Sequence, residues 1–327
     1  IMKVTVVGAG NVGATVANVL ATKKFCSEIV LVDIKDGVPQ GKAMDIMQTA
    51  HMLNFDTTVT GVTAEPNDPN GYAPTAGSEV VVITSGMPRK PGMSREDLIG
   101  VNAKIVKSVV DQALKFSPNA YFIIISNPMD AMTFLTLKDS KLPRNRVLGQ
   151  GGMLDSSRFR YFLAKALTEN GYPATPADVD AMVIGGHSDK TMVPLVSLAT
   201  LRGIPVTKLL TKEVLDDVVA NTKVGGATLT KLLGTSAWMA PGAAAAAMVE
   251  AIALDAKKVI PTCVYLDGEY GEKDLCIGVP VILGKGGCEK IIDLDEAGLL
   301  TGDEKAKFEE SVQAARNTNS KLGDALK

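Results

Sequence analysis

Two patterns of apolar and polar positions take turns along the first half of the chain: short apolar runs and longer stretches with helical periodicity. Short and nearly continuous apolar runs occupy residues 4–7, 29–32, 80–84 and 121–126. Longer stretches between them have helical periodicity, at residues 11–22, 40–53 and 95–116. Continuous apolar runs are typical of parallel strands that are buried on both faces. Their alternation with helices predicts an α/β fold built on a doubly wound parallel sheet.

The pattern changes after a glycine cluster at residues 149–152, which follows a strand-like segment at 146–148. Helices are predicted beyond it at residues 156–170, 212–232, 242–256 and from about 303. Strands are predicted at residues 179–184, 192–198, 258–266 and 275–283. We therefore expect a doubly wound domain at residues 1–150 and an α+β domain at residues 151–327.

Composition narrows the range of partners. The 34 basic and 36 acidic residues nearly cancel, which gives no electrostatic reason to expect nucleic acid. No apolar run approaches the roughly 20 residues of a membrane helix, and the N-terminus lacks the regions of a signal peptide. The cysteines lack metal-ligand spacing and are expected to be reduced thiols: Cys26, Cys263, Cys276 and Cys288. We expect a cytoplasmic protein with no metal, nucleic acid or membrane partner.

A glycine-rich turn follows the first predicted strand. The segment Gly8-Ala9-Gly10-Asn11-Val12-Gly13 has the form G-x-G-x-x-G and opens the first predicted helix. In this motif the first glycine permits a tight turn, the second lets the backbone approach a pyrophosphate, and the third lets helix and strand pack closely. Asp33 ends the second strand, where a carboxylate can bind the adenosine ribose hydroxyls and repel a 2′-phosphate. The motif predicts an NAD site of the Rossmann type, with a purely structural turn as the alternative.

One of the two histidines is a candidate for proton transfer. His187 follows Gly185 and Gly186 after a short apolar run, which would expose its imidazole at a strand end. Hydride transfer at a hydroxyl-bearing carbon needs a proton acceptor near neutral pH, and the ordinary histidine pKa of about 6.5 suits that task. His51 lies inside an amphipathic helix and is interpreted as a packing or interface residue.

An acid and a base at the start of the 156–170 helix are candidates to complete the site. Asp155 could orient the His187 ring and stabilise the imidazolium, although a helix N-cap is an equally ordinary role for aspartate there. Arg158 follows one turn later and could bind a carboxylate through two parallel hydrogen bonds. Its alternative is a surface salt bridge.

A basic loop follows the strand at 80–84. Residues 85–95 contain two prolines, two glycines and three cations, Arg89, Lys90 and Arg95, but no acid. This composition favours a mobile lid at about residues 85–97 that closes over an anionic substrate, with a solvated basic loop as the alternative. At the same predicted sheet edge, Asn127 in Ser126-Asn127-Pro128 could hydrogen-bond a carbonyl or hydroxyl group, although an extended residue before proline also suits a strand end without function.

Taken together, these motifs resemble the lactate/malate dehydrogenase family over nearly the whole chain. The glycine motif, Ser126-Asn127-Pro128, Leu154-Asp155-Ser156-Ser157-Arg158-Phe159 and Gly186-His187-Ser188-Asp189 occur in the family's order and approximate spacing. The resemblance implies an N-terminal Rossmann domain, an α+β catalytic domain, NAD as cofactor and a small 2-hydroxy acid as substrate. It also implies a homo-oligomer, a tetramer or a dimer.

The resemblance implies a role for each matching residue. By this resemblance His187 transfers the proton and Asp155 is its partner. Arg158 binds the substrate carboxylate and Arg95 polarises the carbonyl group. Asn127 and Ser236 contact the substrate. Cofactor contacts are implied at Gly8, Ala9, Gly10, Asn11, Val12, Gly13, Asp33, Thr84, Gly86, Asn102, Ile125, Ser126 and Asn127.

Arg89 is the position that distinguishes substrates within this family. Lactate-type members usually carry glutamine there and malate-type members arginine, and the segment 87–95 looks like the malate form. A monocarboxylate would leave Arg89 buried and unpaired under the lid, which costs roughly 3–5 kcal/mol. Lactate-type members have an acidic residue directly before the catalytic histidine, whereas this chain has Gly186, as malate-type members often do. The segment 234–241 also resembles malate-type members. The implied substrate is the dicarboxylate pair malate and oxaloacetate.

Other functions remain open from the sequence. The nearest is a lactate or other 2-hydroxyacid dehydrogenase on the same scaffold. An NAD-dependent glycosidase has a related fold but would normally need metal-ligand cysteine and histidine in the second domain, and no histidine follows His187. A non-catalytic dinucleotide sensor would leave His187, Asp155 and Arg158 unexplained.

Overall fold

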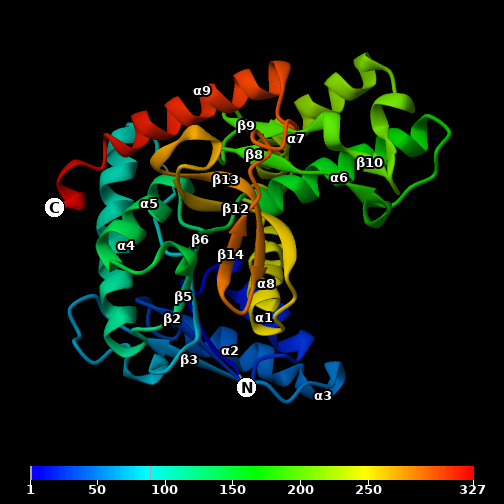
Figure 1. Cartoon of the computed structure of the whole chain (residues 1–327). Helices are drawn as coiled ribbons and strands as arrows, with labels where there is room; N and C mark the ends of the chain where they lie inside the picture. The colour runs from blue at the N-terminus through cyan, green and yellow to red at the C-terminus, as the bar shows by residue number, and fades with distance from the viewer. Residues whose placement is uncertain (1, 89) are drawn as a thin grey trace.

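Parallel strands form the first half of the computed structural model, which describes residues 2–88 and 90–327 (Figure 1). Their bounds are β1 Lys3–Val7, β2 Glu28–Asp33, β3 Thr58–Thr63, β4 Val80–Ile83, β5 Tyr121–Ile124 and β6 Val147–Gly149. The strands lie side by side in the order β3-β2-β1-β4-β5-β6. This is the order of a doubly wound dinucleotide-binding sheet, so the predicted α/β class is confirmed.

Helices connect these strands: α1 Asn11–Lys23, α2 Val38–Gln48, α3 Ala50–Leu53, α4 Arg95–Phe116 and α5 Met129–Ser140. The single helix predicted at 40–53 is wrong, because the chain divides at Thr49 into α2 and α3. The α4 helix begins where the Ser94 hydroxyl and the Asp97 carboxylate each accept a backbone N–H bond from the other residue.

In the first half of the chain, β3 and α5 were not predicted from the sequence. In β3 the sequence TVTGVT has little apolar character, because this edge strand is only partly buried. In α5 the buried positions follow one another along most of the helix, so no amphipathic stripe marks it.

The second half of the chain continues the same sheet. Its helices are α6 Gly152–Glu169, α7 Lys212–Leu233, α8 Met239–Ala253 and α9 Gly302–Asn319. Its strands are β7 Val179–Asp180, β8 Val183–Gly185, β9 Met192–Pro194, β10 Thr200–Leu201, β11 Ile204–Pro205, β12 Lys258–Asp267, β13 Lys273–Gly284 and β14 Gly287–Ile291. The runs predicted as single strands at 179–184 and 192–198 are therefore shorter or broken. The small strands β11, β10 and β7 form a separate sheet.

The antiparallel hairpin of β12 and β13 joins the two halves of the chain. Cys263 on β12 pairs with Gly149 on β6, and Gly278 on β13 pairs with Gly185 on β8. The end of β8 is thereby brought close to the start of α6. This arrangement sets the position of the residues that follow each strand.

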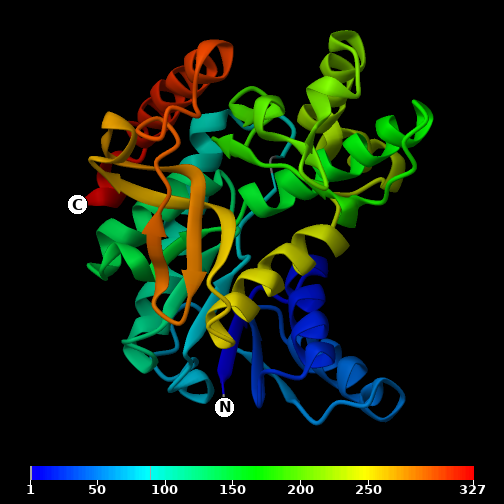
Figure 2. The same cartoon turned by 45° about the vertical axis from the view of Figure 1, so that its right-hand side comes forward.

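Helices α1 and α8 pack closely together, as Figure 2 shows for the blue and yellow helices. A Cβ atom at Gly242 would lie 2.5 Å from Cγ2 of Thr15, so only glycine permits this approach. Within the alanine-rich run of α8, Ala244, Ala245 and Ala246 are buried, which agrees with the interpretation of the run as a close-packing surface. Among the described helices, none is both long enough and apolar enough to cross a membrane.

Candidate active site

The three glycines of the turn after β1 have different environments. Gly8 has a φ of +101°, and a Cβ there would lie 2.2 Å from Oγ1 of Thr84. A Cβ at Gly13 would lie 1.7 Å from the Gly8 carbonyl oxygen, whereas a Cβ at Gly10 would meet nothing within 4 Å. The first and third glycines therefore permit the turn and the packing of α1. The second leaves open space, as a pyrophosphate would require.

Asp33 holds the glycine turn from the neighbouring strand. Its Oδ2 accepts a 2.7 Å hydrogen bond from the backbone N–H of Ala9, and its Oδ1 accepts one of 3.0 Å from Lys35. Each carboxylate oxygen can accept a further bond, so the ribose hydroxyls of a dinucleotide could also bind here.

A cavity of about 670 Å³ lies over this turn. Its lining includes these residues predicted to contact the cofactor: Gly8, Gly10, Asn11, Val12, Gly13, Asp33, Thr84 and Gly86. Ser236 reaches the same cavity from the segment between α7 and α8. The volume is within the range of ligand sites, and the open position at Gly10 fits a dinucleotide phosphate.

One wall of the cavity was not predicted. Lys104, Ser108 and Gln112 lie on α4 at intervals of four residues, so they share one face of the helix, and all three line the cavity. The four-residue spacing of these polar side chains was the signal that could have revealed them.

Three other residues predicted to contact the cofactor are Ala9, Ile125 and Ser126. Ala9 bonds to Asp33 as described, and Ile125 directly follows β5. Ser126 donates a short hydrogen bond to the carbonyl of Ser85. They do not appear among the described residues that line the cavity.

Asn102 is buried on α4 and links two segments. Its Nδ2 donates to the carbonyl of Asn127 at 2.7 Å and to that of Met87 at 3.2 Å, and its Oδ1 accepts from the N–H of Met87 at 2.8 Å. The side chain therefore fixes the start of the basic loop against the end of β5. A contact of Asn102 with the cofactor stays a prediction.

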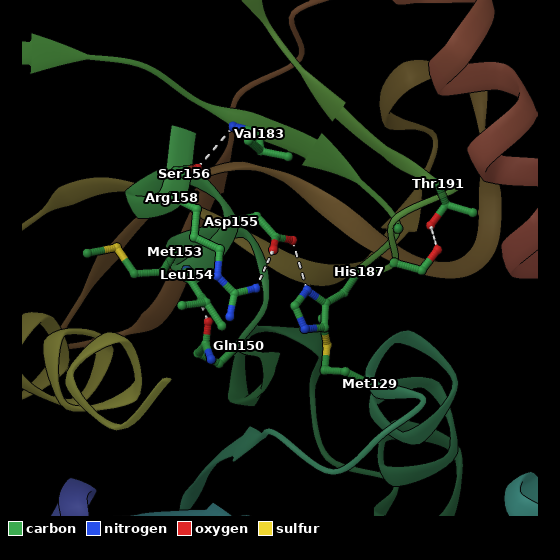
Figure 3. Close-up of polar contacts among 12 residues, drawn as sticks. Met129, Gln150, Met153, Leu154, Asp155, Ser156, Arg158, Val183, His187 and Thr191 are labelled. Carbon is green, nitrogen blue, oxygen red and sulfur yellow. Dashed lines mark hydrogen bonds and ion pairs between the residues drawn. The ribbon is translucent and has the colours of Figure 1, made fainter. Parts of the chain in front are cut away.

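His187 and Asp155 lie together in the second half of the chain (Figure 3). Nδ1 of His187 donates a 2.8 Å hydrogen bond to Oδ2 of Asp155, whose side chain is 2% exposed. A carboxylate on Nδ1 fixes the tautomer and leaves Nε2 as the atom available for proton transfer.

Asp155 does not cap a helix. The α6 helix begins at Gly152, before the predicted 156, and no side chain caps its N-terminus. The carboxylate therefore points from the first turn of the helix to His187, and the capping alternative is wrong.

Arg158 lies on the other side of Asp155 in Figure 3, with Nη1 3.9 Å from Oδ1 of Asp155. The Arg158 side chain is 16% exposed, and its buried Nε has no hydrogen-bond partner among the described residues. A buried guanidinium with an unused donor is suited to an anion, which makes a simple surface salt bridge a poor description.

Gly225 and Gly226 in the middle of α7 make room for this guanidinium. A Cβ at Gly225 would lie 3.2 Å from Cδ of Arg158, and one at Gly226 would lie 3.3 Å from Nη1. Glycine inside a helix costs about 1 kcal/mol relative to alanine, so the pair is better explained by space for Arg158 than by helix stability.

The charges around His187 favour its protonated form. Burial opposes the imidazolium, but the charge and hydrogen bond of Asp155, with a smaller contribution from Asp130, raise the pKa of His187 above its ordinary value. Burial lowers the pKa of Arg158, while Asp155 opposes this change. The site thus combines a histidine whose protonated form is favoured with a cation one helix turn from its carboxylate partner.

Asp130 is a neighbour of His187 that the sequence analysis missed. Its Oδ2 accepts a 2.8 Å hydrogen bond from the backbone N–H of His187. It stands three residues after Asn127, in the first turn of α5. An acid is common at that position of a helix, so the sequence offered no distinct signal.

Among the described residues, those of the basic loop make fewer contacts with His187 than Asp155 and Arg158 do. Arg95 is exposed as the first residue of α4, and within the described part of the chain no hydrogen bond or ion pair joins it to His187. Arg89 lies outside the described residues. His51 is exposed on the short helix α3, so it does not pack in the core.

A metal site in the described ranges would require a cluster of side chains that could bind the ion. No group of three or more His, Cys, Asp or Glu side chains there could hold a metal ion. The four cysteines are free thiols.

Residues 126–130 link the two parts of the site, since Asn127 contacts Asn102 beside the cavity and Asp130 contacts His187. A proton-transfer group next to a dinucleotide cavity is what hydride transfer to a nicotinamide requires, and the fold and site therefore define a nucleotide-dependent dehydrogenase. The chain belongs to the lactate/malate dehydrogenase family. The family's NAD-binding domain matches residues 2–149, and its alpha/beta C-terminal domain matches residues 152–322.

Individual relatives are similar over nearly the whole chain. Malate dehydrogenase of Bacteroides thetaiotaomicron is 62% identical over 320 residues, which cover 98% of this chain and 97% of the relative. The solved malate dehydrogenase of Salinibacter ruber is 45% identical with a TM-score of 0.89, covering 98% of this chain and 97% of that one.

A lactate dehydrogenase has the same fold. The structure of the Cryptosporidium parvum enzyme with lactic acid and nicotinamide adenine dinucleotide is 37% identical, with a TM-score of 0.89, and covers 99% of this chain and 98% of that one. The chain is an NAD-dependent oxidoreductase, and the fold alone does not choose its substrate.

Proposed function

We propose that the protein is an NAD-dependent malate dehydrogenase that interconverts (S)-malate and oxaloacetate. The observation that carries the proposal is the cluster of His187, Asp155 and Arg158, in which a carboxylate-held imidazole lies beside a buried cation with an unused donor. The malate dehydrogenases among its relatives support the dicarboxylate substrate.

His187 moves the proton in this reaction. In the oxidative direction Nε2 accepts the proton of the substrate hydroxyl, and Asp155 stabilises the resulting imidazolium through Nδ1. In the reductive direction protonated His187 returns the proton to the oxygen. When bound, NAD accepts the hydride from the substrate carbon, and NADH supplies it in reverse.

Cations orient the substrate in this proposal. Arg158 binds the carboxylate next to the reacting carbon through two parallel hydrogen bonds. The lid at about residues 85–97 brings Arg89 to the second carboxylate and Arg95 to the carbonyl oxygen. Asn127 and Ser236 contact substrate and nicotinamide from the two sides of the cavity. Binding at both ends of a dicarboxylate converts affinity into orientation.

The cofactor lies along the glycine turn, with its pyrophosphate over Gly10 and the N-terminus of α1 and its adenosine ribose on Asp33. The open space at Gly10 and the presence of Asp33 in the cavity wall support this orientation. Residues 1–150 thus bind NAD, and residues 151–327 supply His187, Asp155 and Arg158.

The test compares oxaloacetate with pyruvate as substrates in the presence of NADH. We expect kcat/KM for oxaloacetate to exceed that for pyruvate by at least about 100-fold, since an unpaired buried Arg89 would cost several kcal/mol. Arg89→Gln should shrink this ratio, whereas the control Arg202→Gln, at a surface ion pair with Asp178, should leave it unchanged. A wild-type preference for pyruvate would instead establish a lactate dehydrogenase.

We also propose that the enzyme is a cytoplasmic homotetramer. Met44 and Met52 on α2 and α3, and Leu232 and Met239 at the junction of α7 and α8, are more than 60% exposed, and such apolar surface suits contacts between copies. Free cysteines agree with a reducing compartment. Sedimentation equilibrium distinguishes the tetramer from a dimer, and a monomer at micromolar concentration would contradict the assembly.

A further inference from the structure

Asp130 lies directly behind the histidine of the active site. Its Oδ2 accepts the backbone N–H of His187 at 2.8 Å, across 57 residues of sequence. No side chain caps α5, so the carboxylate of Asp130 serves the loop of His187 and not the N-terminus of its own helix.

The second oxygen of Asp130 is in an unusual position. Oδ1 is completely buried and has no well-formed hydrogen bond among the described residues. The thiol of Cys263 on β12 lies within reach of the carboxyl group. A buried carboxylate that is incompletely hydrogen-bonded costs free energy, so its presence calls for an explanation other than stability.

Two carboxylates therefore flank the same histidine, with Asp155 on the ring and Asp130 on the backbone. The other ionisable groups that face this cluster are Arg158, beside Asp155, and the Cys263 thiol. We propose that Asp130 is a positioning residue for proton transfer: it fixes the backbone of His187 and places a second negative charge behind the imidazole. The proposal rests on the function of His187 given above.

Burial raises the pKa of Asp130 itself, so its charge acts on His187 at the pH values where this carboxyl group is ionised. Burial works against the imidazolium, Asp155 provides the largest opposing contribution, and Asp130 adds to it, so that the pKa of His187 is raised. Loss of the Asp130 charge must lower that pKa. A lower pKa weakens oxaloacetate reduction at alkaline pH, where His187 must hold a proton, and extends malate oxidation to more acidic pH, where it must be neutral.

Asp130→Asn separates the charge from the hydrogen bond, because the amide oxygen can still accept the N–H of His187. We expect the pKa of His187 to fall by roughly 0.5–1 unit, the range of a nearby charge. The alkaline limb of kcat/KM for oxaloacetate should move equally, giving an about threefold to tenfold loss well above the pKa and little loss below it.

The pKa is measured directly by NMR titration of protein labelled in its histidines, with exposed His51 as the internal reference. This readout needs no turnover, so it distinguishes a failure of this proposal from a failure of the proposed reaction. Thr133→Val is the matched control: Thr133 is also buried on α5, and its hydroxyl bonds only within that helix, to Met129.

A His187 pKa that is the same in Asp130→Asn, Thr133→Val and the wild type would overturn the proposal, whatever the activity. Asp130→Ser, which is smaller and also removes the charge, provides the same test of the His187 pKa if the asparagine variant does not fold. A uniform loss of kcat at every pH in the folded variants, without a shift of the limb, would show a merely structural role.

Discussion

Nδ1 of His187 donates a 2.8 Å hydrogen bond to Oδ2 of Asp155, although 32 residues separate the two in the sequence. Asp155 is held by α6, and His187 follows β8, so the pair exists only because the hairpin of β12 and β13 joins β6 to β8. The proton-transfer group and its partner are thus fixed by two separate elements of one sheet.

Asp155→Asn should therefore impair catalysis without affecting cofactor binding. The amide cannot stabilise the imidazolium, so we expect kcat to fall by roughly 100-fold or more. The alkaline limb of oxaloacetate reduction should also move to lower pH, because Asp155 is the main group that raises the pKa of His187. Stopped-flow turnover and NADH fluorescence titration measure the two effects, and wild-type turnover in this variant would remove the pair from the mechanism.

Asn102→Ala should loosen the start of the basic loop. The change removes three hydrogen bonds and leaves buried backbone groups of Met87 and Asn127 unpaired, at a cost of about 1–3 kcal/mol. We expect a higher KM for oxaloacetate and a lower kcat. The control is Ser117→Ala at the other end of α4, where the lost hydroxyl bonds Ser78 and Thr75 away from the loop. Equal kinetic effects in both variants would mean that only stability had changed.

Gly226→Ala should separate stability from substrate binding. Alanine favours the α7 helix by about 1 kcal/mol, so the melting temperature should be maintained or rise. The new Cβ would lie 3.3 Å from Nη1 of Arg158 and push the guanidinium by a few tenths of an ångström, which should raise KM for oxaloacetate about threefold to tenfold.

Gly41→Ala on α2, where a Cβ meets nothing within 4 Å, is the control for the helix effect alone. An unchanged KM in Gly226→Ala would show that α7 does not constrain Arg158.

Asp111 provides a prediction about pH and stability. Burial, together with the hydrogen bond and charge of Asp139, raises the pKa of Asp111 to about 6, against a smaller opposing effect of Lys107. Between pH 4 and 6 the folded protein thus binds more protons than the unfolded chain, so this group stabilises the fold below about pH 4 and loses that contribution as pH rises through 6.

Asp111→Asn should accordingly raise the melting temperature at pH 8, by about 1–3 °C after allowance for solvent screening, and have little effect at pH 4. Calorimetry at the two pH values makes the comparison. The exposed Asp56→Asn is the control. A gain at pH 4 that equals the gain at pH 8 would contradict the proton sharing of Asp111 and Asp139.

The sequence predicted most elements because their signals are local. The α4 helix has the bounds that its periodicity predicted. The glycine turn was placed correctly because its G-x-G-x-x-G spacing directly follows a strand and opens a helix. The polar edge strand β3 and the helix α5, which is buried along most of its length, lack an alternating pattern, and for that reason they were missed.

The candidate site was only partly visible from the sequence. The order of the motifs around His187, Asp155 and Arg158 indicated the family before any geometry was known. The sequence could not show whether Asp155 caps a helix or holds a histidine, because both roles suit an aspartate at that position. The structure decided between them by starting α6 at Gly152.

By itself, the sequence determined most of the strands and helices, the glycine turn, and which side chains are available for proton transfer and anion binding. Each of these depends on residue types and on neighbours along the chain. Only the tertiary structure decided that Asn102 binds the protein backbone, that Asp130 stands behind His187, and that two glycines of α7 make room for Arg158. These relationships join residues that lie apart in sequence, so neighbours along the chain cannot specify them. The contact of Asp130 with His187 also requires that the two halves of the chain share one sheet.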